Sequence, residues 1–250
     1  ILCDTEIRED VDYYIRKDEI KKKVSKSFLT GKWIFEESHK GRHRFGDYFK
    51  VSNSVATLYN DAFVFEAKAE DELFYYLDGG KVEKEIVYDA ENIKSEKKFQ
   101  NTQKRDKIIF PYKFTGEKVS SYEENEFISK FPECYLYLKR HKERLLKRKS
   151  SEGVQWFEYG RVQAINNIFV EKLIISVIVT NGVQVYNVGS ASVPYAGIYI
   201  RTLQNAKLRL EDAKEILQSK LFYEYIKRCG TPTTTSSYRI SVKDIENYYF

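Results

Sequence analysis

The sequence is poor in residues that break or cross-link a chain. Its 250 residues include 4 Pro, 12 Gly, 3 Cys and no Met. The low Pro and Gly content, together with 20 Tyr and 16 Phe, excludes a disordered or collagen-like chain. Cys3, Cys134 and Cys229 are odd in number and form no C-x-x-C pair. This argues against a disulfide framework and a zinc ribbon, and it fits a reducing cytosol.

Long apolar runs and a signal peptide are also absent. The longest run, 173–179, contains Ser176 and is far shorter than the roughly 18 residues that a membrane span needs. We therefore expect no membrane association and a cytoplasmic location. The chain begins Ile1-Leu2-Cys3-Asp4 without an initiator Met, which indicates a piece of a longer protein. Its length allows a sizeable core, in one large domain or two small ones.

The positive charge is concentrated in one segment. The chain has 42 Lys+Arg and 37 Asp+Glu, a formal net charge of +5. Residues 139–149 hold seven basic residues against Glu143, a local +6, which leaves 35 basic and 36 acidic residues elsewhere, or −1. The basic residues of this segment are Lys139, Arg140, Lys142, Arg144, Lys147, Arg148 and Lys149.

The same segment has the periodicity of a helix. Phe131, Tyr135, Leu138 and Leu145 recur at helical spacing, and Pro132 is placed in the first turn, where its missing N–H costs nothing. The pattern predicts an apolar stripe beneath a basic face. Such a face is either solvated surface or a surface that contacts phosphates, and the sequence leaves both interpretations open.

The remaining pattern is one of short strands and a few helices. It predicts an α+β fold that is rich in antiparallel strands, with two or three longer helices. The polar stretch 89–106 is expected to be a loop or a surface helix. The expected elements are hairpins over 55–67 and 73–88, a strand over 107–114, a hairpin over 173–188 with its turn at Asn181-Gly182, a helix over 210–225 that stops at Gly230, and a last strand over 238–242.

One pattern is typical of an enzyme. Glu66 and Lys68 form an E-x-K on an expected strand, with Asp47 and Asp61 upstream. Many nucleases hold Mg²⁺ between such carboxylates while the Lys orients the attacking water, but the pattern is common by chance and also fits an ordinary strand. No glycine-rich phosphate loop, H-E-x-x-H or G-x-S-x-G motif is present.

The histidines offer little further chemistry. His39 and His43 are four residues apart but stand among Lys and Arg, which would repel a cation. We therefore assign no metal site to this chain. His141 lies within the basic segment and is expected to be a polar surface residue.

An ordered set of segments resembles the C-terminal specificity domain of adenine-N6 DNA methyltransferases of the Eco57I and TaqI type. The likeness extends from about Trp33 to the end of the chain. The segments are FGDYFKVSNSVATL (45–58), NDAFVF (60–65), PYKF (111–114), FPECYLYL (131–138), WFEYGRVQ (156–163), KLIIS (172–176) and YRISVKDI (238–245). Ser54 departs from the family, which has a Gly before the Val-Ala-Thr step.

The resemblance implies a DNA target-recognition domain over 33–250, in one piece or in two lobes, 33–130 and 131–250. It also implies that 1–32 is a helical connector from an N-terminal catalytic domain of the same parent. The family's N-P-P-Y motif and S-adenosylmethionine loop do not occur here. We therefore expect no cofactor in this chain, S-adenosylmethionine in the parent, and no activity from this chain alone.

The expected partner is double-stranded DNA. The seven basic residues of 139–149 are the phosphate-contact candidates, and the base-contact candidates are Arg161, Gln163, Asn166 and Asn167, since Arg, Gln and Asn can pair bidentately with bases. Taken singly, Arg161 could instead pair with a carboxylate and the Asn residues could cap a helix. Two other functions stay open: a metal-dependent nuclease and a non-catalytic docking module.

Overall fold

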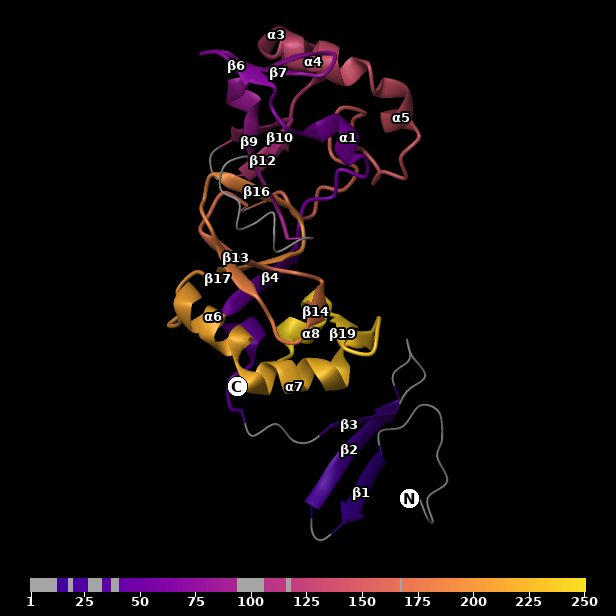
Figure 1. Cartoon of the computed structure of the whole chain (residues 1–250), viewed down its shortest axis with the longest axis vertical. Helices are drawn as coiled ribbons and strands as arrows, with labels where there is room; N and C mark the ends of the chain where they lie inside the picture. Colours follow the sequence, from indigo (N-terminus) through magenta and orange to yellow (C-terminus); the bar gives the residue numbers. More distant parts are fainter. Residues whose placement is uncertain are drawn as a thin grey trace. The chain divides into compact units, whose positions relative to one another are not determined.

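The chain folds into two compact units, and each contains segments that are distant in sequence. The computed structural model describes strand backbone at 13–17, 20–26 and 33–36, and residues 41–93, 106–115, 118–166 and 168–250. Unit 1 comprises 1–50, 177–184 and 202–250, and unit 2 comprises 51–176 and 185–201 (Figure 1). The predicted lobes 33–130 and 131–250 are therefore wrong, because long-range strand pairing decides the division.

Unit 1 combines two small sheets with three helices. One sheet has the order β1-β2-β3 and the other has the order β14-β19-β18, all antiparallel. The strands are β1 (Tyr13–Lys17), β2 (Ile20–Lys26), β3 (Trp33–Glu36), β14 (Ile178–Thr180), β18 (Thr231–Pro232) and β19 (Ser237–Arg239), and the helices are α6 (Leu210–Gln218), α7 (Lys220–Cys229) and α8 (Val242–Glu246). The rings of Phe222 and Tyr248 pack edge to face, with their centroids 4.9 Å apart.

The prediction of a helical connector over 1–32 is wrong where the structure describes this segment. Residues 13–17 and 20–26 are antiparallel strands, with Tyr13 opposite Val24. Aromatic and β-branched residues favour strands, and strand pairing overrides the helix propensity of the lysines.

Unit 2 contains most of the strands. Its sheets have the orders β16-β9-β10-β5, β15-β13-β17-β4, β6-β7-β8 and β11-β12. Every pair for which a register is given is antiparallel, except that β16 lies parallel to β9. The strands are β4 (Phe49–Asn53), β5 (Val64–Phe65), β6 (Ala69–Glu70), β7 (Phe74–Leu77), β8 (Gly80–Glu83), β9 (Val87–Asn92), β10 (Lys107–Ile109), β11 (Tyr112–Thr115), β12 (Lys118–Ser121), β13 (Lys172–Ile175), β15 (Val185–Val188), β16 (Ser192–Ala196) and β17 (Ile198–Thr202).

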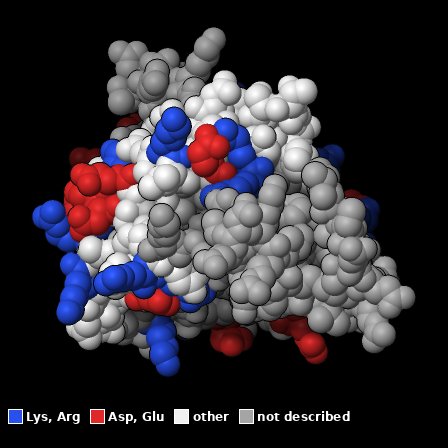
Figure 2. Space-filling view, turned by 90° about the horizontal axis from the view of Figure 1, so that it is seen from below, with Lys and Arg blue, Asp and Glu red and all other residues white. Residues whose placement is uncertain are grey.

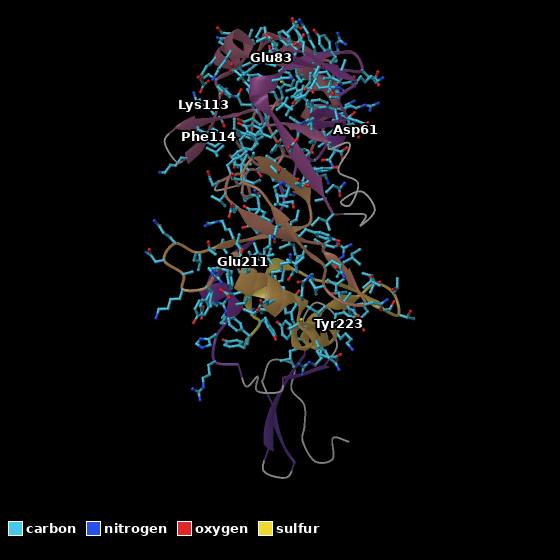
Figure 3. The ribbon with its side chains drawn as sticks, turned by 60° about the vertical axis from the view of Figure 1, so that its left-hand side comes forward. Asp61, Glu83, Lys113, Phe114, Glu211 and Tyr223 are labelled. Carbon is cyan, nitrogen blue, oxygen red and sulfur yellow. The ribbon has the colours of Figure 1, made fainter. Side chains whose placement is uncertain are left out.

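Helices and aromatic rings close the core of unit 2. The helices are α1 (Asn60–Phe63), α3 (Glu124–Lys130), α4 (Pro132–Lys139) and α5 (Lys142–Leu146). The rings of Phe127 and Phe157 stack at 4.7 Å, and the edge-to-face pair Phe63–Tyr159 is at 5.2 Å. Phe114 of β11, labelled in Figure 3, is exposed on one side, and its ring packs edge to face on Phe169 at 5.1 Å. The mixed helices and antiparallel-rich sheets confirm the α+β prediction.

The helix predicted around the basic segment is divided into α4 and α5. Arg140 N–H donates to Tyr137 O at 3.2 Å and His141 N–H donates to Leu138 O at 2.9 Å, a tighter three-residue pattern that interrupts the α-helix. The apolar stripe is confirmed, since Phe131, Leu138 and Leu145 are buried. The position of Pro132 in the first turn of α4 is also confirmed.

Other local predictions are only partly correct. The hairpin over 73–88 is β7 paired with β8, and Gly79 in its turn has φ +83°. The segment 55–67 is not a hairpin, because 60–63 forms α1 and β5 pairs with the distant β10. The strand over 107–114 is interrupted between β10 and β11, at Phe110-Pro111, where proline offers no N–H to a ladder.

The C-terminal predictions show the same mixture. In the hairpin over 173–188, β13 pairs with β15 whereas β14 pairs with β19, although Asn181 and Gly182 do take positive φ. The helix over 210–225 is broken at Ser219, whose side chain caps α7, and Gly230 ends α7 as predicted. The predicted strand 238–242 contributes to β19 and then turns into α8. The polar stretch 89–106 begins within β9 (87–92), and its residues 94–105 lie outside the described residues.

The helices of the described residues are short. None of them is long and apolar enough to cross a membrane.

A carboxylate from β8 caps the start of α4. Both oxygens of Glu83, labelled in Figure 3, accept backbone N–H groups, those of Glu133 and Cys134, each at 2.9 Å. The N-cap residue Phe131 supplies no side-chain acceptor itself. A negative group from another element thus satisfies two orphan donors at the positive end of the helix.

This cap predicts the effect of one substitution. Glu83→Ala should lower the free energy of unfolding by about 1–2 kcal/mol, because two helix N–H groups lose their acceptor. Denaturant unfolding followed by circular dichroism measures the change. Glu85→Ala, at an exposed position of the same segment, is the control and should stay within about 0.5 kcal/mol of wild type. Equal effects of the two changes would contradict the capping role.

Candidate nucleic-acid interface

A short loop of unit 2 connects the two groups of predicted DNA-contact residues. We call residues 54–59 the central loop. Its Ala56 O accepts the N–H of Arg161 and its Thr57 O accepts the N–H of Gly160, both at 3.1 Å. The base-contact candidate Arg161 is therefore attached to the central loop by an isolated antiparallel bridge.

The basic segment is attached to the other end of the same loop. Arg144 Nη1 donates to the Tyr59 hydroxyl at 2.8 Å, and the guanidinium lies 5.8 Å from the centroid of the Tyr59 ring. Ala56 and Tyr59 are three residues apart, so their Cα atoms are at most about 11 Å apart. The loop thus brings Arg144 and the Gly160-Arg161 turn into one region of unit 2.

The half-buried side chain of Arg148 joins these segments through hydrogen bonds. Its side chain donates to Leu145 O at 2.9 Å, to Trp156 O at 2.8 Å, to Glu158 O at 2.9 Å and to Thr57 O. All three guanidinium nitrogens are engaged. Burial lowers the pKa of Arg148, but a guanidinium keeps its charge in proteins. Arg148 therefore holds α5, the central loop and the 156–158 segment together, and it differs from the predicted phosphate contacts.

The other basic residues of the segment lie at the surface. Lys142 is half-buried, 4.6 Å from the centroid of the Trp156 ring and 3.9 Å from Glu124 Oε1. Lys147 forms an ion pair with Glu143 one turn away. The exposed cations are Lys139, Arg140, Arg144, Lys147 and Lys149. On the face shown in Figure 2, basic and acidic side chains of the described residues lie interspersed.

The base-contact candidates follow on the adjoining turn. Arg161, Gln163 and Asn166 are exposed, and none of the three side chains has a hydrogen bond or ion pair with another described residue. Among the described residues, no carboxylate pairs with Arg161, as a purely structural role of this residue would require. Asn167 lies outside the described residues.

Several residues of this region were not singled out from the sequence. Tyr59 and Tyr137 pack against His141, with ring centroids at 5.9 and 5.2 Å. His141 is therefore half-buried rather than a plain surface residue, and burial, followed by the charge of Arg144, lowers its pKa. The aromatic residues near the dense basic run are the feature of the sequence that could have indicated this packing.

The residues of the nuclease hypothesis do not form a metal site in the described part of the chain. Asp47 belongs to unit 1 and pairs with Arg44 at 3.1 Å, and Lys68 pairs with Asp78. Asp61, labelled in Figure 3, lies in α1 of unit 2. No group of three or more His, Cys, Asp and Glu that could hold a metal occurs among the described residues, and His39 lies outside them.

Glu158 is a buried carboxyl beneath the interface. Its side chain is 1% exposed, Oε2 accepts the N–H of Gln155 at 3.1 Å, and Oε1 has no hydrogen-bond partner among the described residues. Burial raises the pKa of Glu158. The charged form is therefore disfavoured in the folded protein.

The contrast between neighbouring basic residues gives one prediction. Arg148→Ala should destabilise the fold by roughly 2 kcal/mol, because it removes a half-buried cation whose hydrogen bonds to four backbone carbonyls join three segments. Lys149→Ala is the control and should change stability by less than about 0.5 kcal/mol, since Lys149 is exposed. Thermal and urea unfolding measure both. If both variants match wild type in stability, the hydrogen bonds of Arg148 do not hold these segments together.

The buried carboxyl gives a second prediction, on pH. A raised native pKa means that the folded protein holds a proton at Glu158 above pH 4.5, where the unfolded chain has begun to lose it. The contribution of Glu158 to stability should therefore fall as pH rises above 4.5, and Glu158→Gln should be more stable than wild type at pH 7.5, with the difference shrinking toward pH 4.5. Melting temperatures across this range measure the effect. Exposed Glu152→Gln is the control, and a pH-independent difference for Glu158→Gln would contradict the assignment.

The chain is similar in sequence to the type II restriction enzyme and methyltransferase RM.Eco57I of Escherichia coli. The two are 26% identical over 147 residues, which cover 53% of this chain and 15% of the relative. This chain therefore corresponds to a small part of that relative's length. No protein-family model matches the chain. The similarity supports a relationship to restriction–modification enzymes.

Proposed function

We propose that this chain is a DNA target-recognition module of a restriction–modification protein. It binds double-stranded DNA and reads its sequence, so that an adenine is positioned for N6 methylation. The methyl group comes from S-adenosylmethionine, which is bound by a catalytic methyltransferase domain of the same parent protein. The similarity to RM.Eco57I, a type II restriction enzyme and methyltransferase, supports this context.

One observation carries the proposal. The exposed Arg161 has no partner among the described residues, and the central loop attaches it to the basic segment through Ala56 and, three residues on, through Tyr59 and Arg144. A free guanidinium beside a cluster of exposed cations is the combination that sequence-specific DNA binding needs, because phosphate contacts set the register and base contacts set the specificity.

The two groups of residues have different tasks. Lys139, Arg140, Arg144, Lys147 and Lys149 neutralise phosphates and release counterions, with Lys142 at the edge of this group. Arg161 suits guanine, whose O6 and N7 accept both arms of a guanidinium, while Gln163 and Asn166 suit adenine. Arg148 is left out of the interface, because its donors are used within the fold.

A selection experiment tests the function directly. Duplexes that contain a randomised stretch are incubated with the 250-residue chain, and the bound fraction is amplified and sequenced over several rounds. Enrichment of one short sequence is expected. A nuclease would instead cut the duplexes when Mg²⁺ is added, and a docking module would show no salt-dependent binding. Either result would overturn the proposal.

Substitutions should then separate phosphate contacts from base contacts. Lys139→Ala, Arg144→Ala and Lys149→Ala should each weaken binding to all sequences alike and reduce the salt slope by roughly one, where a phosphate is contacted. Arg161→Ala should cost about 1–3 kcal/mol on the selected duplex and little on a scrambled one. Fluorescence anisotropy at several salt concentrations measures both.

The control for general charge effects is Lys207→Ala, an exposed lysine of unit 1. It should leave the salt slope unchanged. If Arg161→Ala weakens both duplexes equally, Arg161 contacts the backbone and does not read a base. If the basic-segment variants keep the wild-type slope, their face is solvated surface only.

A further inference from the structure

The central loop contains a leucine in an unfavourable backbone conformation. Leu58 has φ +58° and is 41% exposed. The other residues besides glycine with positive φ in the described part of the chain are Asn181 and Asn205, and asparagine tolerates this region. A bulky apolar residue there is an outlier, and such outliers persist where the surroundings fix the backbone and cluster at functional sites.

Hydrogen bonds on the N-terminal side of Leu58 fix it in this conformation. Thr57 is buried, and its carbonyl accepts from Gly160 N–H and from Arg148. The Thr57 hydroxyl accepts the N–H of Tyr59 at 3.1 Å and donates to Asn60 Oδ1 at 2.5 Å. Hydrogen bonds therefore fix the residues on both sides of Leu58, and the chain turns at Leu58.

The Leu58 side chain lies over the backbone of Gly160. A Cβ at Gly160 would be 2.5 Å from Leu58 Cδ1 and 2.6 Å from Leu58 Cγ, which no side chain could accommodate without movement. Gly160 is therefore a glycine for reasons of space. Leu58 thus contacts the residue next to Arg161, and its own neighbour Tyr59 holds Arg144.

We propose that Leu58 is an apolar wedge that inserts between adjacent base pairs of bound DNA. The proposal rests on the proposed function. Leu58 is an exposed leucine held at positive φ; its side chain lies on Gly160, the neighbour of Arg161, and the next residue, Tyr59, bonds Arg144. An apolar side chain with cations near it has the composition of the wedges by which proteins unstack a base step. The cations bind the duplex near the leucine, and the hydrogen bonds of Thr57 and Tyr59 hold its backbone in one place.

The test uses variants that suit the backbone. Leu58→Asn and Leu58→Gly tolerate positive φ but lack the apolar side chain, whereas Leu58→Met keeps an unbranched apolar wedge. The selected duplex carries 2-aminopurine, an adenine analogue that brightens when it is unstacked, at each position of the site in turn. Wild type and Leu58→Met should brighten the probe at one step.

The Asn and Gly variants should bind the selected duplex roughly tenfold more weakly, because the apolar contact of the leucine with the bases is lost, and they should not brighten it. Their salt slope should equal that of wild type, because no phosphate contact is removed. If they bind and brighten the duplex as wild type does, or if wild type brightens no position, Leu58 is only a cover for Gly160. If wild type selects no sequence, the proposed function fails first, and that result is distinct from failure of the wedge.

Discussion

The candidate interface depends on the half-buried guanidinium of Arg148. A cation that is partly removed from water is stable only where its donors are satisfied, and here four carbonyl contacts replace the lost hydration. Those carbonyls belong to α5, to the nearby 156–158 segment and to Thr57 of the central loop, which is distant from both in sequence. The donors of Arg148 are satisfied together when all three segments are in place. The same interaction therefore fixes the base of the Gly160-Arg161 turn relative to α5.

Features that depend on local chemistry could be predicted from the sequence. The buried stripe through Phe131, Leu138 and Leu145 follows from spacing alone, and Pro132 begins α4 because its missing N–H is not needed there. Gly79 allows the β7–β8 turn, and Gly230 ends α7. The α+β class follows from the sum of such local signals.

Features that depend on distant partners could not be predicted. The segment 55–58 is predicted as a strand of a local hairpin, but its carbonyls bond the Gly160-Arg161 turn, which lies about a hundred residues away in sequence. Arg148 and Lys149 look alike within a basic run, and only the position of carbonyls in other segments makes one half-buried and leaves the other exposed. The division into two units likewise follows from pairs such as β14–β19, for which the sequence gives no local sign.

Arg148 and Arg161 show how one side-chain chemistry acquires two uses. Arg148 exchanged its hydration for carbonyl contacts during folding, so its binding capacity is already used. Arg161 is exposed and keeps its hydration, so the loss of water can be compensated by a ligand that offers two coplanar acceptors. A base-reading arginine must be unpaired before DNA arrives, because an internal partner would have to be displaced at a cost comparable to the discrimination it supplies. A rigid turn under a free side chain meets this requirement, since the backbone is ordered in advance and only the guanidinium remains to be fixed on binding.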